Sequence, residues 1–212
     1  ALGLNGVKAK AVSISAENDI AVNKKIVADN VEMLSNNGSL LQDSTNDEGL
    51  ITSQVKLTAK NNIILENSHN TFSNTDINGK NGILTGNMQV KTKADNGLNI
   101  NGGDLTVHGD VYIENLGQNS ADVNLNKGKI EVVKTNDVDG NISFTAVKGK
   151  VNNNTQISAD KNINITGSNG IENKKSVQST LGDIVISSKN GNIKNTADIE
   201  AENKLTVATR SG

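Results

Sequence analysis

The chain has 212 residues and a formal net charge of −2, and only 34% of its residues are hydrophobic and 1% aromatic. Typical domains use about 45–50% apolar residues, so an ordinary aromatic-filled globular core is excluded. Interspersed charges, the absence of cysteine and the lack of a long apolar run argue against a nucleic-acid surface, a disulfide framework and membrane insertion.

The first predicted elements lie within residues 1–34. Val12, Ile14 and Ala16 alternate with polar residues, and after a polar gap Ile20 and Val22 continue the alternation. A period of two predicts strands, and a polar gap of this kind predicts a turn. The same strand–turn–strand template recurs at 55–65, 90–100, 155–165 and 197–207.

The apolar register drifts in residues 1–120. Its column steps by 21 or 22 through Ile20, Leu41, Ile63, Leu84 and Leu105. The polar stretches 35–38, 42–49 and 67–82 are predicted to be loops of variable length between these positions.

Residues 121–212 repeat with a regular step of 21. The columns are Ala121, Ile142, Ile163, Ile184, Leu205; Val123, Phe144, Ile165, Ile186, Val207; Ile130, Val151, Ile171, Ile193; and Ile157, Val177, Ile199. Glycines follow the same step at Gly128, Gly149, Gly170, Gly191 and Gly212, where we expect turns with positive φ.

A unit of about 21 residues with three short strands cannot bury its own apolar face, so it must stack on its copies. We therefore predict an all-β fold, a right-handed parallel β-helix of roughly ten coils. The chain is expected to be a single segment, with irregular coils over 1–120 and regular coils over 121–212.

The template units also resemble a known family. Residues 12–22, 55–65 and 157–165 are similar to the degenerate repeats of filamentous-haemagglutinin-type exoproteins, which include two-partner-secretion adhesins and the stalks of contact-dependent growth-inhibition systems. The resemblance implies a secreted, surface-located, virulence-associated repeat protein that uses an outer-membrane transporter. The family's secretion domain typically carries Asn-Pro motifs, and this chain has no proline, so we expect an interior filament segment.

Few residues qualify as a chemical site. Asn-Gly pairs begin at Asn5, Asn37, Asn78, Asn81, Asn96, Asn101, Asn169 and Asn190, and glycosylation sequons begin at Asn37, Asn141, Asn153 and Asn164. The pairs are expected to form turns. Residues 101–110 resemble a single calcium-binding nonapeptide, and His69 and His108 lack a second ligand at zinc spacing. We predict no catalytic, cofactor-binding or metal-binding residue.

The predicted function is therefore mechanical and adhesive. The chain is expected to be a monomeric, non-enzymatic stalk whose recognition surface for a host or target-cell receptor or glycan, if it carries one, lies at 67–82 or 115–122. The alternative is a polysaccharide-binding or polysaccharide-degrading β-helix. Tyr112 and two phenylalanines offer such a cleft little aromatic surface, and a threonine column at Thr52, Thr71 and Thr92 is too short for an ice-binding face.

Overall fold

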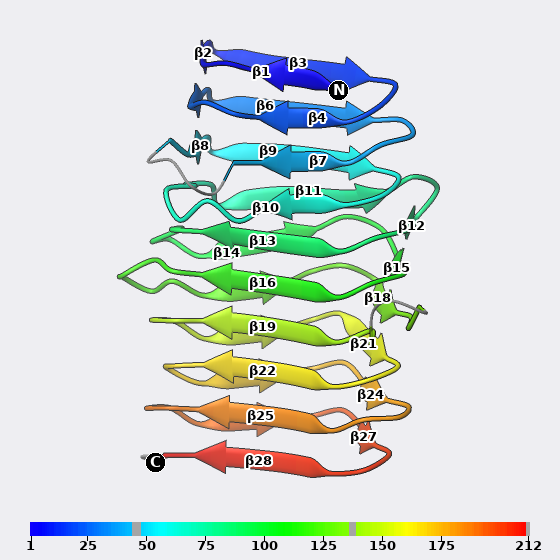
Figure 1. Ribbon diagram of the computed structural model, residues 1–212. Helices are drawn as coiled ribbons and strands as arrows, with labels where there is room; N and C mark the ends of the chain where they lie inside the picture. The colour runs from blue at the N-terminus through cyan, green and yellow to red at the C-terminus, as the bar shows by residue number, and fades with distance from the viewer. Residues whose placement is uncertain (44–47, 136–138, 211–212) are drawn as a thin grey trace.

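The computed structural model describes residues 1–43, 48–135 and 139–210. These residues contain no helix, and their strands stack in parallel as a β-solenoid with about 22 residues per turn. From the N-terminus the chain runs leftward along the front sheet, rightward along the rear sheet, and descends, which is a right-handed winding (Figure 1). The predicted fold class is confirmed.

Two large sheets form the broad faces. Sheet A contains β1 (Leu2–Leu4), β4 (Ile20–Val22), β7 (Leu40–Gln42), β10 (Ile63–Leu65), β13 (Met88–Thr92), β16 (Val111–Asn115), β19 (Ile142–Ala146), β22 (Ile163–Gly167), β25 (Ile184–Ser188) and β28 (Leu205–Thr209). Sheet C contains β3 (Ala11–Ala16), β6 (Asn30–Ser35), β9 (Gln54–Ala59), β11 (Asn74–Gly79), β14 (Leu98–Asn101), β17 (Val123–Leu125), β20 (Val151–Asn153), β23 (Ile171–Asn173) and β26 (Ile193–Asn195).

Two smaller sheets form the narrow sides of the solenoid. Sheet B contains β2 (Val7–Lys8), β5 (Ile26–Val27) and β8 (Leu50–Ile51). Sheet D contains β12 (Ile83–Leu84), β15 (Leu105–Val107), β18 (Lys129–Val132), β21 (Gln156–Ala159), β24 (Val177–Ser179) and β27 (Ile199–Ala201). In chain order sheet B lies between A and C, whereas sheet D lies between C and A, so the narrow strand changes sides along the molecule (Figure 1).

The predicted 21-residue step holds in the last four strands of sheet A. Ile142, Ile163, Ile184 and Leu205 are paired in succession. The step before Ile142 is longer, because Ile142 pairs with Val111, which lies 31 residues earlier. The regular part of sheet A therefore begins at β19.

The predicted placement of Ala121 and Val123 in the sheet A columns is wrong. Val123 lies in β17 of sheet C, while Phe144 lies in β19 of sheet A. β18 ends at Val132 and β19 begins only at Ile142, so a step of 21 back from Ile142 ends at Ala121, just before β17. A constant step cannot detect an inserted loop.

Two further register predictions are corrected in the same way. Ile130 pairs with Ile157 in sheet D, so it does not belong to the column of sheet C residues in which it was placed. Leu41 points outward with 37% of its surface exposed, and Leu40 is the residue that pairs with Ile20 in the core column. Leu41 is one residue out of register, and in a strand such a shift moves a side chain to the opposite face.

The strand–turn–strand template is confirmed, but it occurs at different corners. Residues 12–22 pass from β3 in sheet C to β4 in sheet A, whereas 90–100 pass from β13 in sheet A to β14 in sheet C. Residues 155–165 pass from β21 in sheet D to β22 in sheet A. One local pattern therefore encodes a tight corner without specifying which corner.

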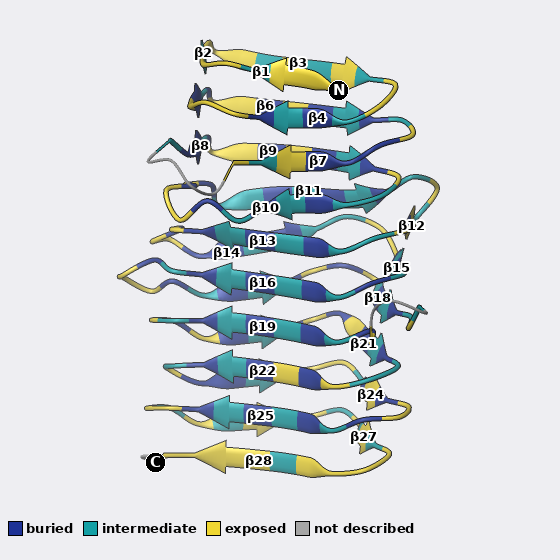
Figure 2. Cartoon of the chain, viewed as in Figure 1, coloured by how far each residue is buried: buried dark blue, intermediate teal, exposed yellow. Residues whose placement is uncertain are grey.

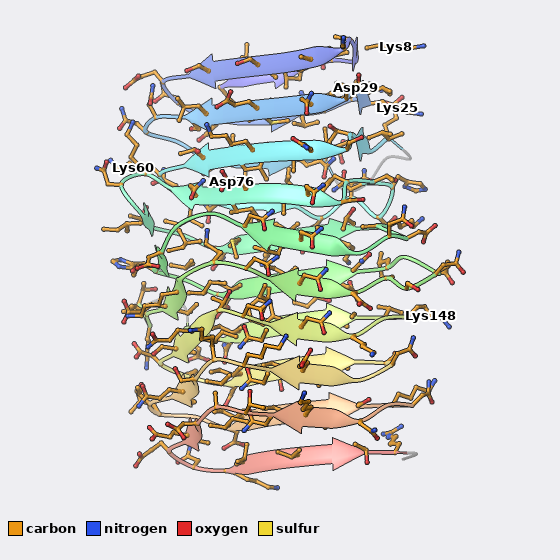
Figure 3. The ribbon with its side chains drawn as sticks, turned by 180° about the vertical axis from the view of Figure 1, so that it is seen from behind. Lys8, Lys25, Asp29, Lys60, Asp76 and Lys148 are labelled. Atoms are coloured by element: carbon orange, nitrogen blue, oxygen red, sulfur yellow. The ribbon has the colours of Figure 1, made fainter. Side chains whose placement is uncertain are left out.

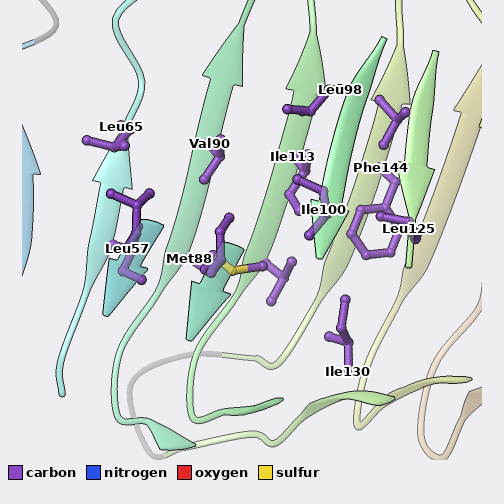
Figure 4. Packing of buried hydrophobic residues seen from close by; sticks show 14 of the residues in the cluster. Leu57, Leu65, Met88, Val90, Leu98, Ile100, Ile113, Leu125, Ile130 and Phe144 are labelled. Atoms are coloured by element: carbon purple, nitrogen blue, oxygen red, sulfur yellow. The ribbon is translucent and has the colours of Figure 1, made fainter. Parts of the chain in front are cut away.

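The core is one aliphatic column running through the stacked coils. Figure 2 shows buried residues along the inner positions of the strands, and Figure 4 shows Phe144 among stacked Leu, Ile and Val side chains. Phe72 and Phe144 are fully buried and are the largest of these side chains. Aliphatic stacking thus replaces the aromatic packing that the composition lacks.

A ladder of polar residues precedes the strands of sheet A from β4 to β25. Each acceptor oxygen receives a backbone N–H from the next coil, at 2.7 to 3.2 Å. We call this the entry ladder, and its members are Asp19, Ser39, Asn62, Asn87, Asp110, Asn141, Asn162 and Asp183. Hydrogen bonds of this kind contribute about 0.5–1.5 kcal/mol each, and here they join successive coils from β4 to β25.

The predicted glycine column has two structural roles. Of its members within the described residues, only Gly170 has a positive φ, of 129°. At Gly149 and Gly191 an added Cβ would lie 2.3 Å or less from backbone atoms of the preceding coil. Close approach of the coils, and not positive φ, explains those two glycines, while Gly212 lies outside the described residues.

Candidate binding site on the outer face of sheet A

The outer face of sheet A carries an aromatic side chain surrounded by polar ones. Tyr112, on β16, is the single tyrosine of the chain. It pairs with Gln89 on one neighbouring strand and Ser143 on the other, and Ser143 pairs in turn with Asn164. These residues line a hollow of about 460 Å³ together with Glu66, Lys91, Asp110, Asn141 and Asn162. We call it the Tyr112 hollow.

Tyr112 is half-buried in a polar and acidic setting. Burial raises the pKa of its phenol to about 12, and the carboxylates of Glu114 and Glu66 act in the same direction. The hydroxyl therefore stays protonated at neutral pH, beside the carboxylate of Glu114.

The polar neighbours of Tyr112 are partly engaged with one another. The Gln89 amide nitrogen, assigned toward Glu66, lies 3.2 Å from both carboxylate oxygens. Lys91 Nζ lies 3.4 Å from a Glu114 oxygen. Asn164 is exposed, and within the described residues its side chain makes no hydrogen bond. The hollow thus combines polar groups that are held by neighbours with the Asn164 amide, which is open to a ligand.

Sheet C presents a second polar face, shown from behind in Figure 3. Asn74, Asn99, Asn124 and Asn152 form a ladder in which each amide donates to the preceding one, at 2.7 to 2.9 Å. A shallow hollow of about 630 Å³ lies over the N-terminal end of this face, beside Glu32, Lys56 and Asp76. This hollow is the larger of the two, but its Lys56 and Glu32 are paired with each other, and its lining includes no aromatic side chain.

A buried lysine joins three coils where sheet C turns toward sheet D. Lys127 is only 2% exposed, and its Nζ donates to the carbonyl oxygens of Ile77 at 2.7 Å and Asn101 at 3.2 Å. Burial lowers the pKa of Lys127 to about 8, while Asp76 and Asp104 oppose that shift. Solvent does not reach the amine, so Lys127 acts as a strap between coils.

Gly102 makes room for this strap. A Cβ at Gly102 would lie 2.6 Å from Lys127 Nζ and 2.5 Å from an Asp76 oxygen, and its φ is +118°. The sequence placed Gly102 in a calcium-like segment and Lys127 in the turn before Gly128. The contacts of Lys127 between coils were missed because its partners lie 26 and 50 residues away.

The predicted recognition segment 67–82 is largely internal. Residues 74–79 form β11, which pairs over its full length with β9, so the prediction of a loop there is wrong. Asn67, Asn70 and Phe72 are fully buried. Two of the three inward positions of β11 are Thr75 and Gly79, which are not apolar strand formers, so the alternating pattern that predicts a strand is missing.

In the second predicted recognition segment, 115–122, only the tip is accessible. Asn115 is buried, and its amide donates to the Ala94 and Asp122 carbonyls, while residues 118–120 are exposed. The structure brings neither predicted segment into the Tyr112 hollow. In the sequence, Tyr112 served only to show that aromatic residues are scarce.

The remaining candidate residues are dispersed. Asn153 is buried, whereas Asn37 and Asn164 are exposed, so the sequons differ in accessibility. Thr52 and Thr92 are buried, so they cannot form an outer threonine column. Within residues 1–43, 48–135 and 139–210 there is no cluster of three or more His, Cys, Asp or Glu side chains that could hold a metal ion. The same residues include no helix long and apolar enough to cross a membrane.

Comparison of the chain with protein-family models, with curated proteins and with solved structures gave no match. The description of the fold therefore depends on strand pairing and burial alone. The sequence signal that could have located the outer-face site is the single tyrosine at an outward position of a strand whose inward neighbours are Val111 and Ile113.

Proposed function

We propose that the chain is a rigid, non-catalytic spacer and adhesive segment of a large secreted bacterial exoprotein. The observation that carries this proposal is the uninterrupted ten-stranded sheet A, in which every coil is hydrogen-bonded to the next from β1 to β28. With strands about 4.8 Å apart, this sheet separates the two ends of the chain by roughly 43 Å. Because each coil is bonded to the next, such a stack should behave as one rigid body between its two ends.

The resemblance to filamentous-haemagglutinin-type repeats supports the extracellular setting. It is carried by the template units at 12–22, 55–65 and 157–165, each of which forms a strand, a tight corner and a second strand. By that resemblance, the parent protein is exported through an outer-membrane transporter and displayed at the bacterial surface. Sequencing the locus that encodes the chain tests this part, since a neighbouring transporter gene is expected and its absence would remove the two-partner-secretion assignment.

The spacer role is tested by the distance between the ends. Spin labels at exposed Ser13 on β3 and Glu200 on β27 should give one narrow distance distribution by pulsed electron resonance. The distribution should be unchanged when moderate denaturant is added below the unfolding transition. A broad distribution in buffer would contradict a rigid spacer.

The adhesive role needs a separate measurement. Beads coated with the purified chain should adhere to epithelial or bacterial target cells, and free chain should compete with them. Beads that bind no more than albumin-coated beads would leave a spacer without adhesion.

A further inference from the structure

We infer that the Tyr112 hollow binds a neutral oligosaccharide. The inference gives the proposed adhesive function its ligand class, and it rests on that function only for its biological setting. It is carried by the arrangement of one aromatic ring, amides with and without hydrogen bonds, and an excess of carboxylates over cations on a broad, backbone-paired sheet.

The first argument is the aromatic platform. Sugar rings present apolar C–H faces as well as hydroxyls, and an aromatic side chain with a polar tip suits such an amphipathic surface. Tyr112 is half-buried on a strand paired on both sides, so the freedom of its ring is reduced before a ligand arrives. On the β19 side its neighbour is the short Ser143, which leaves that flank of the ring open to the hollow.

The second argument is the supply of hydrogen-bonding groups. Asn164 lies two strands from Tyr112 in the same outward column, and its exposed amide has both a donor and an acceptor to offer. Asn162 and Asn141 line the adjacent edge, and their positions are fixed because both belong to the entry ladder. Convergent, preordered amides are suited to the paired hydroxyls of a sugar ring.

The third argument is charge, which distinguishes neutral sugars from anionic ones. The single cation of the hollow, Lys91, lies against Glu114, and the other charged groups of its lining are the carboxylates Glu66 and Asp110. An anionic polysaccharide would meet these carboxylates without a free cation to offset them. A neutral chain meets no such penalty.

The direction of the hollow also fits a chain-like ligand. Tyr112, Ser143 and Asn164 lie on three consecutive strands, so the site runs along the solenoid axis and not along a strand. Its walls are backbone-paired strands, which change little on binding. A linear oligosaccharide lying along the axis would cover the ring at one end and the Asn164 amide at the other.

The test uses the full chain and its own fluorophore. Because the chain has one tyrosine and no tryptophan, its intrinsic fluorescence reports on Tyr112 alone. The chain is titrated with maltohexaose, cellohexaose, xylohexaose and the anionic hexagalacturonate. At least one neutral probe should change the fluorescence saturably, and hexagalacturonate should not.

Three variants, measured by calorimetry, then locate the site. Tyr112→Ala should abolish heat from the responding probe, and Asn164→Ala should weaken binding roughly tenfold through the lost amide contacts. Ser143→Leu should block binding by filling the open flank while keeping an outward strand position. Asn169→Ala, at an exposed corner outside the hollow, is the matched control and should bind as the unmodified chain does.

The inference is overturned if none of the neutral probes binds, if hexagalacturonate binds more tightly than they do, or if Ser143→Leu and Tyr112→Ala both bind normally. Thermal unfolding of each variant is recorded alongside, so that a loss of binding with an unchanged Tm is separated from misfolding. Failure here, with the end-to-end distance still narrow and the beads still adhering, would leave the proposed spacer and adhesive function intact.

Discussion

The first three coils and the last four build the same core with different cross-sections. In the first three, sheet C strands of six residues such as β3 face sheet A, and sheet B closes one narrow side. In the last four, sheet C strands such as β23 have three residues, and sheet D closes the opposite side. Sheet A is continuous through both, although its strands lengthen from three residues, as in β4, to five, as in β25. One continuous sheet with its entry ladder is therefore sufficient to keep the stack in register while the rest of the coil is rearranged.

The change of cross-section is concentrated in the coil around β11. All six residues of β11 pair with β9, but only its first three pair with β14. The C-terminal half of the long strand has no counterpart in β14, and the next coil bends at Gly102 and continues as β15 in sheet D. Buried polar residues at this junction, Asn70 and Lys127 among them, form hydrogen bonds between neighbouring coils.

The largest expected effect comes from breaking the regular region at its core. Ile165 is fully buried in β22, so Ile165→Asp places an unpaired carboxylate in the aliphatic column and should cost about 4 kcal/mol or more. Chemical denaturation should show the loss, and hydrogen exchange should show reduced protection in β22 and both flanking strands.

The neighbouring outward position provides the control. Asn164→Asp introduces the same group on the exposed face of the same strand and should change stability by about 0.5 kcal/mol or less. Equal stabilities for the two variants would contradict the inward direction of Ile165.

The second prediction addresses the junction between the two regions. Asn70 is fully buried; its Oδ1 accepts from the Leu50 backbone N–H at 2.8 Å, and its Nδ2 donates to Gln42 at 2.8 Å. Asn70→Ala leaves these buried groups unsatisfied, at about 1–3 kcal/mol each, so we expect a total loss of about 3 kcal/mol. Unfolding should then separate into two transitions, one for each region.

Asn190→Ala is the matched control for Asn70→Ala, because Asn190 is an exposed corner asparagine. It should retain one cooperative transition. If Asn70→Ala also unfolds in a single transition with unchanged stability, the junction is not the weak point of the solenoid.

The sequence was informative wherever coil length is constant. The columns through Ile163 and Ile184 follow from a step of 21, because no loop intervenes. Val123 was misplaced because an inserted loop shifts the register without changing the apolar pattern. The entry ladder was missed because Asn and Asp were assigned to turns, although each ladder member directly precedes a buried strand residue.

The sequence could have drawn attention to Tyr112, but not to the residues that surround it on the outer face. Tyr112 meets Gln89 and Ser143 only through steps of 23 and 31 residues, which differ because the coils differ in length. No fixed period brings these three residues together. Outward neighbours in a solenoid depend on every loop between them, whereas the inward pattern is repeated locally in each strand.

The third prediction concerns pH and the strap at Lys127. Its pKa of about 8 in the folded chain lies below the unfolded value of 10.5, so the unfolded chain binds more protons between these values. Stability should therefore rise as pH increases from 8 to 10, by about 2 kcal/mol. Above pH 10 the raised pKa of Tyr112 acts in the opposite direction, because the folded phenol keeps the proton that the unfolded one loses.

Lys127→Met isolates this contribution, since it keeps the apolar stem and removes the titrating amine. The variant should lose the rise between pH 8 and 10 in denaturation curves, while Lys150→Met at an exposed position should retain it. A rise that survives in Lys127→Met would assign the pH dependence to another group.

The smallest expected effect tests the long sheet C strands of the first three coils. Lys56 on β9 and Glu32 on β6 form an ion pair of 2.8 Å, and their side chains are 53% and 49% exposed. Exposed pairs of this kind contribute about 0–1 kcal/mol because solvent screens them, so Lys56→Ala should change stability by under about 0.5 kcal/mol. A loss larger than that of Asn70→Ala would mean that surface charge, and not the shared sheet A, holds the wide coils together. A small loss, further reduced by added salt, would mean that both cross-sections depend on the same buried column.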